Sequence, residues 1–276
     1  MLHCGVIELD TSAQALAYRR AYDDQLRARL GDSRGSTIER VGPLVRRTPE
    51  QGAGFVLYRD LGGLRGAELD ALIDDQVRHF AALGRSFEWK WHHYDEPDDL
   101  TDRLRAKGFT PEEDETVHIG PVGPLAVPAE VPDGVVVRAA TGRADLDRIR
   151  AMEEKVWGFD HSWLPDALAR FMDPDDGDPA VVVLAEAGDE VVCASWAVFH
   201  TGTEFASLWG GSTLEQWRGK GIYRALVAYR ARLAAERGFR YLQVDASPDS
   251  RPILTRLGLR PVAVTVPYVW RPVEQA

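Results

Sequence analysis

The chain has 276 residues, about twice the length of a typical domain, which allows two modest domains or one large one. Its 45% hydrophobic and 28% charged residues are typical of a globular protein, and its formal net charge of −10 argues against a general nucleic-acid or anionic-membrane binder. The only two cysteines, Cys4 and Cys193, lie too far apart in sequence for a disulfide framework or a metal-type spacing. Without a long apolar run or a signal-peptide pattern, we expect a cytoplasmic protein that does not bind membranes.

Hydrophobic periodicity in the first half predicts helices that alternate with strands. Between residues 86 and 93, Phe87, Trp89 and Trp91 alternate with polar residues, which is typical of a strand. The predicted elements are helices at 12–30, 68–83 and 98–106 and strands at 55–58, 86–93 and 116–119.

A stretch rich in proline and glycine separates the two halves. Residues 120–134 contain four prolines and three glycines and end in Asp133-Gly134, so we interpret them as a linker that continues neither a helix nor a central strand. We therefore predict one domain at 1–128 and a second at 129–276.

The second half repeats the alternation and ends with a strand. A helix at 219–237 has Ile222, Leu226, Tyr229 and Leu233 on one face. The other predicted elements are helices at 144–157, 162–172 and 251–257 and strands at 134–138, 180–186, 191–200, 204–209, 241–245 and 262–270.

The two halves share an order of elements. In each, a helix ends at a glycine (Gly84, Gly238), an apolar strand follows, and a short helix stops at a second glycine (Gly108, Gly258) before a final strand. An internal duplication explains this order, and the chance similarity of common αβ units is the alternative.

The most informative segment is the loop from Thr213 to Leu226. A strand ends, Gly219 and Gly221 allow a tight turn with exposed amides, and a helix begins at once. Such a turn directs backbone N–H groups and a helix N-terminus at one point, which suits phosphate oxygens, and Arg218 and Lys220 add positive charge there. A glycine-rich turn without a ligand is the alternative.

This loop resembles the signature of the GNAT superfamily of N-acyltransferases, Arg/Gln-x-x-Gly-x-Gly/Ala at the start of a central helix. In the preferred register the match runs from Arg218 to Tyr223, where Tyr223 replaces the usual small residue. A second register, from Gln216 to Gly221, matches every position of this pattern but shifts the start of the helix by two residues. Residues 241–247 and 251–260 are similar to the family's fifth strand and its following helix, and residues 134–272 show the family's whole order of elements.

The resemblance implies an α+β fold with two GNAT-like domains, each a mixed, mostly antiparallel twisted sheet flanked by helices. The first half keeps the Gly108-Phe109 ending, but its loop at 62–68 lacks the second phosphate-loop glycine of the family pattern and carries Glu68. The resemblance therefore assigns the acyl-CoA site to 129–276 and leaves 1–128 as a degenerate copy without one.

For function, the resemblance implies an N-acetyltransferase in which a primary amine attacks the thioester of acetyl-CoA directly, with both substrates bound and no metal. Positioning then supplies much of the catalysis, and a general base takes the amine proton. The residues expected at the acetyl-CoA site are Gly211, Ser212, Thr213, Arg218, Gly219, Lys220, Gly221, Ile222, Tyr223, Ser247 and Ser250.

The catalytic residues of the family do not carry over directly. Ser207 stands where some relatives have a glutamate base, and Leu254 stands where many have a tyrosine acid. Asp245, after a buried strand, is our candidate base, with a solvated turn residue as the alternative. Tyr268 is the candidate acid for the thiolate, with a packed aromatic ring as the alternative. His161, in the loop that usually covers the acceptor, lines a pocket or packs between helices.

We expect a small-molecule or peptide amine as the acceptor, and a homodimer remains open. A non-catalytic acyl-CoA-binding or regulatory protein is the main alternative, and a pure assembly module is the other. The sequence names neither the acceptor nor the preferred acyl chain.

Overall fold

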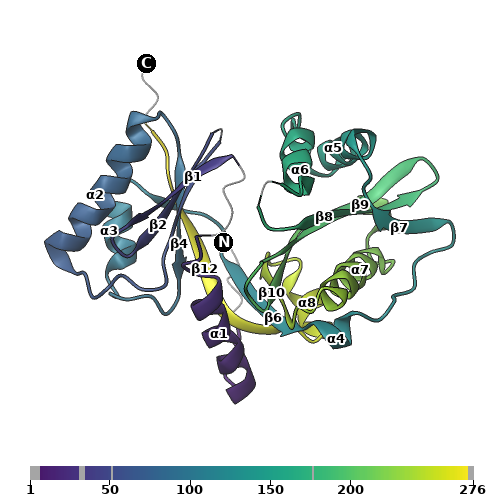
Figure 1. The fold of residues 1–276 in the computed structure, drawn as a ribbon, viewed down its shortest axis with the longest axis horizontal. Coiled ribbons are helices and arrows are strands. Elements are labelled where there is room, and N and C mark those ends of the chain that lie inside the picture. Colours follow the sequence, from purple (N-terminus) through teal and green to yellow (C-terminus); the bar gives the residue numbers. More distant parts are fainter. Residues whose placement is uncertain (1–6, 31–34, 51, 176, 273–276) are drawn as a thin grey trace. The chain divides into compact units, whose positions relative to one another are not determined.

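The computed structural model describes residues 7–30, 35–50, 52–175 and 177–272 (Figure 1). Within these ranges the chain forms two compact units, which we call unit 1 (residues 1–118, 245–256 and 260–276) and unit 2 (residues 119–244 and 257–259). Cys4 and the last four residues lie outside the described ranges. None of the helices in the described part of the chain combines the length and the hydropathy that spanning a bilayer requires.

Unit 1 is a mixed sheet with the strand order β1-β2-β3-β4-β12. Strands β3 and β4 run parallel, whereas β12, from the end of the chain, lies antiparallel to β4 and pairs Trp270 with Phe87. The strands are β1 (Ser36–Val41), β2 (Leu44–Pro49), β3 (Gly54–Leu57), β4 (Phe87–His92), the short β5 (Thr110–Pro111) and β12 (Arg260–Trp270). The helices are α1 (Ala13–Gln25), α2 (Gly66–Ala82), α3 (Leu100–Ala106) and α8 (Arg251–Arg256).

Aromatic rings fill the core of unit 1. Phe80 of α2 stacks on Phe87 of β4 with ring centroids 4.3 Å apart, and Phe109 meets Phe87 edge-on. Gly54 leaves room for Phe80, because a Cβ at residue 54 would lie 2.0 Å from that ring. Tyr268 of β12 belongs to this core and is 2% exposed.

Unit 2 has the strand order β6-β11-β10-β9-β8-β7. Strands β10 and β11 run parallel, and the pairs β7–β8, β8–β9 and β9–β10 are antiparallel. The strands are β6 (Glu115–Pro121), β7 (Val135–Ala139), β8 (Ala180–Ala187), β9 (Glu190–Phe199), β10 (Phe205–Thr213) and β11 (Tyr241–Ala246). The helices are α4 (Val122–Leu125), α5 (Arg143–Trp157), α6 (Leu164–Met172), α7 (Ile222–Glu236) and the 3₁₀ turn at Glu215–Trp217.

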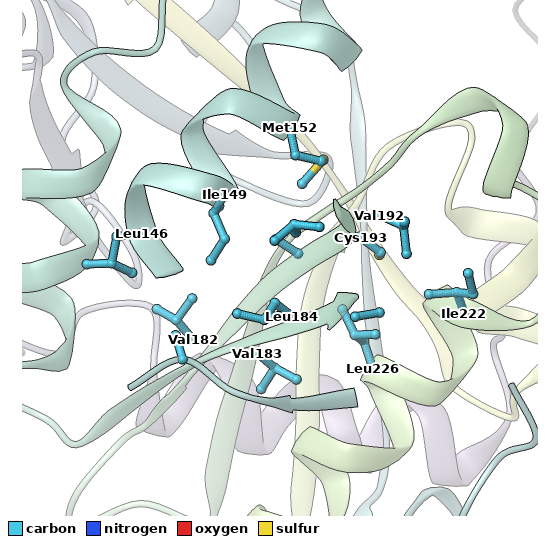
Figure 2. Close-up of a cluster of buried hydrophobic side chains, with 14 of the residues drawn as sticks. Leu146, Ile149, Met152, Val182, Val183, Leu184, Val192, Cys193, Ile222 and Leu226 are labelled. Atoms are coloured by element: carbon cyan, nitrogen blue, oxygen red, sulfur yellow. The ribbon is translucent and has the colours of Figure 1, made fainter. Parts of the chain in front are cut away.

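A continuous apolar cluster joins helices α5, α6 and α7 to strands β8 and β9 of unit 2. Figure 2 shows Ile149 and Met152 of α5 above the sheet and Ile222 and Leu226 of α7 around its edge, with Cys193 between them. These side chains are at most 2% exposed. The cluster fixes α5 and α7 on the sheet, and these two helices carry the candidate site.

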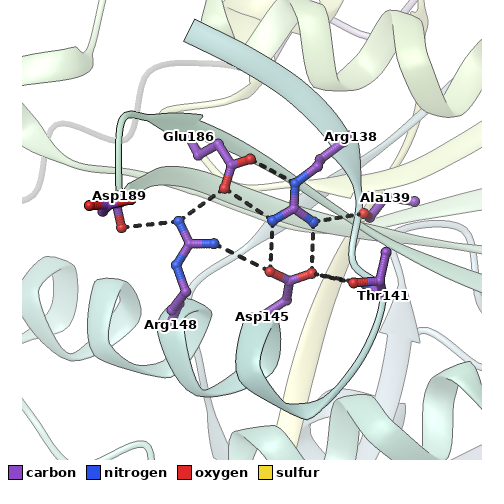
Figure 3. Close-up of polar contacts among 7 residues, drawn as sticks. All are labelled: Arg138, Ala139, Thr141, Asp145, Arg148, Glu186 and Asp189. Atoms are coloured by element: carbon purple, nitrogen blue, oxygen red, sulfur yellow. Dashed lines mark hydrogen bonds and ion pairs between the residues drawn. The ribbon is translucent and has the colours of Figure 1, made fainter.

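A charged network holds the start of α5 against strands β7 and β8 (Figure 3). Arg138 of β7 binds Asp145 through two hydrogen bonds of 2.7 Å and donates from Nε to Glu186 of β8 at 2.7 Å. Arg148 reaches the same two carboxylates. Asp145 also accepts from the backbone N–H of Thr141 at 2.9 Å, so one carboxylate ties the strand, the turn and the helix together.

Two features of the fold differ from the sequence predictions. The segment predicted as a linker continues β6 to Pro121 and then forms the single turn α4. Gly120 is part of that strand because Leu259 packs against it, at 3.1 Å from where a Cβ would stand. Strands β1 and β2 were not predicted, because charged residues interrupt their alternation.

Unit 1 combines separate stretches of the sequence, since β12 from the end of the chain pairs with β4, and the predicted domain bounds 1–128 and 129–276 stay a prediction.

Candidate functional site

Strand β10 ends in a bulge where the backbone leaves the ladder. Gly210 pairs with Ser195 and Ser212 pairs with Ala194, so Gly211 has no partner on β9. Gly210 and Gly211 both have positive φ, +65° and +124°. An unpaired bulge residue leaves its backbone groups available to a ligand. The predicted site residues Gly211, Ser212 and Thr213 therefore occupy the bulge and the end of the strand.

Aromatic rings pack against both glycines of the bulge. A Cβ at Gly210 would lie 2.7 Å from the Trp196 ring, and a Cβ at Gly211 would lie 2.6 Å from the Tyr223 ring. Tyr223, in the first turn of α7, thus uses its larger side chain to support the bulge. Burial raises the pKa of the Tyr223 hydroxyl, while the nearby Arg230 lowers it in part.

A buried arginine fixes the backbone on the inner side of this bulge. Arg230 of α7 is 1% exposed and donates from Nη1 to the carbonyl oxygens of Trp196, at 3.0 Å, and of Trp209, at 3.3 Å. Burial lowers its pKa to about 10. Sequence analysis missed Arg230, although an arginine on the apolar face of a helix is a visible signal.

The glycine loop leads directly into α7. Gly221 has φ +82° and precedes Ile222, and no side chain in the described part of the chain caps the helix. The first helical bond runs from the Ala225 N–H to the Gly221 carbonyl, so the N–H groups of the first turn face outward. This end of α7 therefore offers the amides that the sequence predicted.

Three cations surround the loop. Arg218 donates from Nε to the Thr213 carbonyl at 3.1 Å, which closes the turn. The Lys220 ammonium lies 4.7 Å from the centre of the Trp217 ring, and the loop positions of Arg218, Gly219 and Lys220 are exposed. Arg224, which was not among the predicted site residues, places Nη2 3.7 Å from the ideal Cβ position of Gly221.

The remaining predicted site residues lie in unit 1. Ser247 and Ser250 form the turn between β11 and α8, where the Ser250 hydroxyl donates to the Ser247 carbonyl at 3.2 Å. Asp245, near the end of β11, accepts a 2.6 Å bond from the Lys90 ammonium, and Glu115 is the second partner of that lysine. Burial alone lowers the pKa of Lys90, but the two carboxylates hold it well above its usual value. Asp245 as a base stays a prediction, and as a base it would give up this ion pair.

Tyr268 lies in the aromatic core of unit 1. Its hydroxyl accepts from Nη2 of Arg105 at 2.9 Å, and its ring meets Trp91 edge-on. The structure thus gives Tyr268 a packing role, and its role as an acid stays a prediction. His161 is buried, and its ring stacks on Phe159, with centroids 4.5 Å apart, and on Trp163, with centroids 6.1 Å apart.

Helix α5 carries a buried carboxylate that the sequence analysis missed, and this group faces the end of β10. Glu153 is 4% exposed, and its Oε2 accepts from Nε1 of Trp157 at 2.8 Å. The same Trp157 nitrogen lies 3.1 Å from Oγ of Ser212 in the bulge. Glu153 follows Leu146 and Ile149 on the buried face of α5, and a charged residue at such a spacing is the signal that would have found it.

Among the described residues, no three His, Cys, Asp or Glu side chains form a cluster that could hold a metal ion. The candidate site in unit 2 combines backbone amides, cations, aromatic rings and a buried carboxylate.

Residues 146–258 match the model of the acetyltransferase (GNAT) family. The chain contains a GNAT acetyltransferase domain. No curated protein matches the chain with significant similarity.

Solved structures share the fold over nearly the whole chain. A GCN5-related N-acetyltransferase from Kribbella flavida superposes with a TM-score of 0.66 at 18% identity, over 94% of this chain and 96% of that one. A functionally unknown conserved protein from Staphylococcus epidermidis gives 0.65 at 11% identity, over 91% and 98%. A tandem GNAT protein from the clavulanic acid biosynthesis pathway gives 0.61 at 15% identity, over 88% and 85%. The predicted α+β class with two GNAT-like domains is confirmed.

Proposed function

We propose that this protein is an acetyltransferase that moves the acetyl group of acetyl-CoA to a primary amine while both substrates are bound. The observation that carries the proposal is the junction of β10 and α7, where an unpaired bulge, an uncapped helix start and a cationic loop follow one another within a GNAT acetyltransferase domain.

Each part of this junction matches one part of acetyl-CoA. The amides after Gly219 and Gly221 and the charges of Arg218, Lys220 and Arg224 suit the pyrophosphate. The amide groups of Gly211, Ser212 and Thr213 suit the pantetheine chain and the thioester carbonyl, whose oxygen gains negative charge as the amine attacks. Ile222 and Tyr223 hold the first turn of α7, and a role of Ser247 and Ser250 in acetyl-CoA binding stays a prediction.

The reaction needs orientation and one proton transfer. The ammonium form of the acceptor loses a proton, the free amine bonds to the carbonyl carbon, and the C–S bond breaks. A second amine proton ends on the coenzyme A sulfur. Holding the two substrates in line supplies much of the rate, and a positioned base supplies the rest.

Calorimetry and a coenzyme A release assay test the proposal. The wild-type protein is expected to bind acetyl-CoA and to release coenzyme A with at least one amine from a panel of spermidine, lysine, kanamycin, 2-phenylethylamine and a peptide with a free N-terminus. The Gly221→Asp variant is expected to lose acetyl-CoA binding, because the carboxylate blocks the pyrophosphate sterically and by charge.

Gly188→Asp is the matched control. Gly188 also has positive φ, +58°, and a Cβ there meets no described atom within 4 Å, but it lies in the β8–β9 hairpin. Unchanged acetyl-CoA affinity of folded Gly221→Asp would contradict the site. Binding of acetyl-CoA without coenzyme A release for any amine would favour the non-catalytic alternative.

A further inference from the structure

Unit 2 contains a buried titratable group, the carboxylate of Glu153, to which the proposed reaction has not yet given a role. The buried carboxylate of Glu153 has one oxygen, Oε2, bonded to Trp157, while Oε1 has no hydrogen-bond partner among the described residues. A buried carboxylate oxygen without a partner costs free energy, and such a cost persists where the group has a function.

Glu153 connects to the bulge of β10 through its neighbours. Trp157 Nε1 lies within hydrogen-bonding distance of both Glu153 Oε2, 2.8 Å, and Ser212 Oγ, 3.1 Å. Because Trp157 Nε1 donates to both groups, the Ser212 hydroxyl lies beside the Glu153 carboxylate, and it lowers the pKa of that carboxyl group in part. Ser212 is partly exposed, and it follows Gly211, the unpaired residue of the bulge. The buried carboxylate and the partly exposed hydroxyl group thus share one indole N–H at the bulge.

We propose that Glu153 is the proton acceptor of the acetyl transfer, and that the Ser212 hydroxyl relays the proton from the acceptor amine. This inference rests on the proposed function and names a residue for its undetermined step. It assigns Glu153 the role that the sequence analysis gave to Asp245, whose carboxylate is paired with Lys90.

The proton balance of the relay is complete. An ammonium N–H proton moves to Ser212 Oγ as the hydroxyl proton of Ser212 moves to Glu153, which leaves a neutral amine and a neutral carboxylic acid. The amine nitrogen bonds to the thioester carbon, the C–S bond breaks, and a second nitrogen proton moves to the sulfur. Glu153 then returns its proton to water through Ser212.

The surroundings of Glu153 affect how readily its carboxylate accepts a proton. Burial raises its pKa, whereas the Ser212 hydroxyl, the hydrogen bond from Trp157 and the charge of His161 oppose that shift. From the facing strand, Cys193 is the other titratable neighbour, and burial raises its pKa to about 11, so the thiol stays protonated. A carboxyl group with a raised pKa is a better proton acceptor than an exposed one.

Exposed aromatic rings at the end of α5 and in the segment that follows it guide the choice of acceptor for the test. Trp157, Phe159 and Trp163 are 57%, 60% and 59% exposed although they are large and apolar. Rings of this kind favour a cationic amine with a flat apolar group. We therefore include 2-phenylethylamine beside spermidine as a probe.

The test compares Glu153→Gln with Glu154→Gln. Both variants remove one negative charge from α5, but Glu154 is more exposed and bonds the backbone N–H of His161 at 3.3 Å. With the panel amine that the wild type acetylates fastest, Glu153→Gln is expected to lower kcat about 10²–10⁴-fold. Its affinity for acetyl-CoA is expected to stay within twofold of wild type, and Glu154→Gln is expected to retain wild-type kcat.

The pH profile separates a base from a structural residue. Wild-type kcat/KM is expected to rise with pH through the raised pKa of Glu153, because only the carboxylate accepts a proton, and this limb is expected to disappear in Glu153→Gln. Ser212→Ala is the second variant, and it is expected to lower kcat while it leaves acetyl-CoA affinity intact.

The possible outcomes distinguish the role of Glu153 from the proposed function as an acetyltransferase. A folded Glu153→Gln variant with kcat within threefold of wild type and the same pH profile overturns the inference and leaves the proposed function standing. Equal losses in Glu153→Gln and Glu154→Gln also overturn it, since they reflect a general charge effect. A wild-type protein that acetylates none of the five amines contradicts the proposed function, and the inference falls with it.

Discussion

At the scale of single residues, the end of β10 depends on the fit between glycines and aromatic rings. Trp196 and Tyr223 take the space that side chains at Gly210 and Gly211 would occupy. The GNAT-like sequence pattern has a small residue where this chain has Tyr223. Here the Tyr223 ring packs against the bulge at Gly211. The glycine bulge and the large residue at position 223 therefore belong to the same packing arrangement.

The substitution Gly211→Ala tests this arrangement. The new Cβ would lie 2.6 Å from the Tyr223 ring, whereas a Cβ at Gly219 meets no described atom within 4 Å, and both glycines have positive φ. Gly211→Ala is expected to lower the free energy of unfolding by about 1–3 kcal/mol more than Gly219→Ala, measured by urea denaturation. Adding Tyr223→Ala is expected to remove that excess, and equal losses for both alanine variants would contradict the packing role of Tyr223.

Glu88 of β4 makes a pH dependence testable in unit 1. Burial raises its pKa to about 7, Lys90 opposes the shift, and Glu115, Asp245 and Glu112 reinforce it. Between about pH 4.3, where an unfolded glutamate titrates, and pH 7, the folded state binds more protons than the unfolded state. The free energy of unfolding therefore falls as the pH rises through this window.

Glu88→Gln is expected to flatten that slope and to be more stable than the wild type at pH 8, while the two proteins converge near pH 4. Denaturation in urea at pH 4, 6 and 8 measures the effect. Glu68→Gln, which removes an exposed carboxylate from the same unit, is the control and is expected to keep the wild-type slope. A Glu88→Gln variant with an unchanged slope would contradict the raised pKa.

At the scale of elements, helix α5 carries Glu153 and is held at its start by the network around Asp145. The Arg138 hydrogen bonds hold the pKa of Asp145 well below its usual range, although burial raises it in part. A carboxylate of this kind stabilises the fold above the pKa of the unfolded state, near 4, and loses that effect as the pH falls through the folded pKa. The position of α5 therefore depends on one ionised group.

Asp145→Asn is expected to lower the free energy of unfolding at pH 7 by about 2 kcal/mol, because the hydrogen bonds to charged partners are lost. The difference from wild type is expected to shrink below pH 4. Asp147→Asn is the control on the same helix, since Asp147 and Arg143 are 49% and 57% exposed, and about 0.5 kcal/mol or less is expected for it. Guanidinium denaturation measures both, and similar losses would contradict a special role of Asp145.

Elements with clear periodicity were predicted well, and elements set by distant partners were not. The helix predicted at 219–237 begins at Ile222, because Gly221 adopts a left-handed backbone before it. The strand of Phe87, Trp89 and Trp91 was visible from its alternation. Strands β1 and β2 were missed because Glu39, Arg40, Arg46 and Arg47 hide their pattern.

The candidate site was predictable where the backbone makes it and not where side chains from separate elements meet. Glycine spacing located the loop and the helix start. The contact of Tyr223 with Gly211 and the group formed by Glu153, Trp157 and Ser212 depend on how α5, α7 and β10 pack, which no local pattern records.

At the scale of the whole molecule, both units contain a parallel strand pair with an intervening helix, β3-α2-β4 in unit 1 and β10-α7-β11 in unit 2. The loop before α2 opens into a pocket of about 520 Å³. Its charged groups pair with one another: Arg27 binds Asp95 at 2.7 Å, the Tyr58 hydroxyl donates to Asp95 at 2.6 Å, and Arg65 binds Glu96 at 2.9 Å.

This difference between the units predicts one acetyl-CoA per chain. In unit 1 the cations of the pocket are already neutralised by carboxylates, and Glu68 in the first turn of α2 repels a pyrophosphate. Unit 2 presents Arg218, Lys220 and Arg224 around an uncapped helix start. Isothermal titration calorimetry is expected to give a stoichiometry near one. Gly221→Asp is expected to abolish all binding, whereas Gly66→Asp in the equivalent loop of unit 1 is expected to change neither affinity nor stoichiometry. A value near two, or residual binding in Gly221→Asp that Gly66→Asp removes, would show that unit 1 holds a second acetyl-CoA.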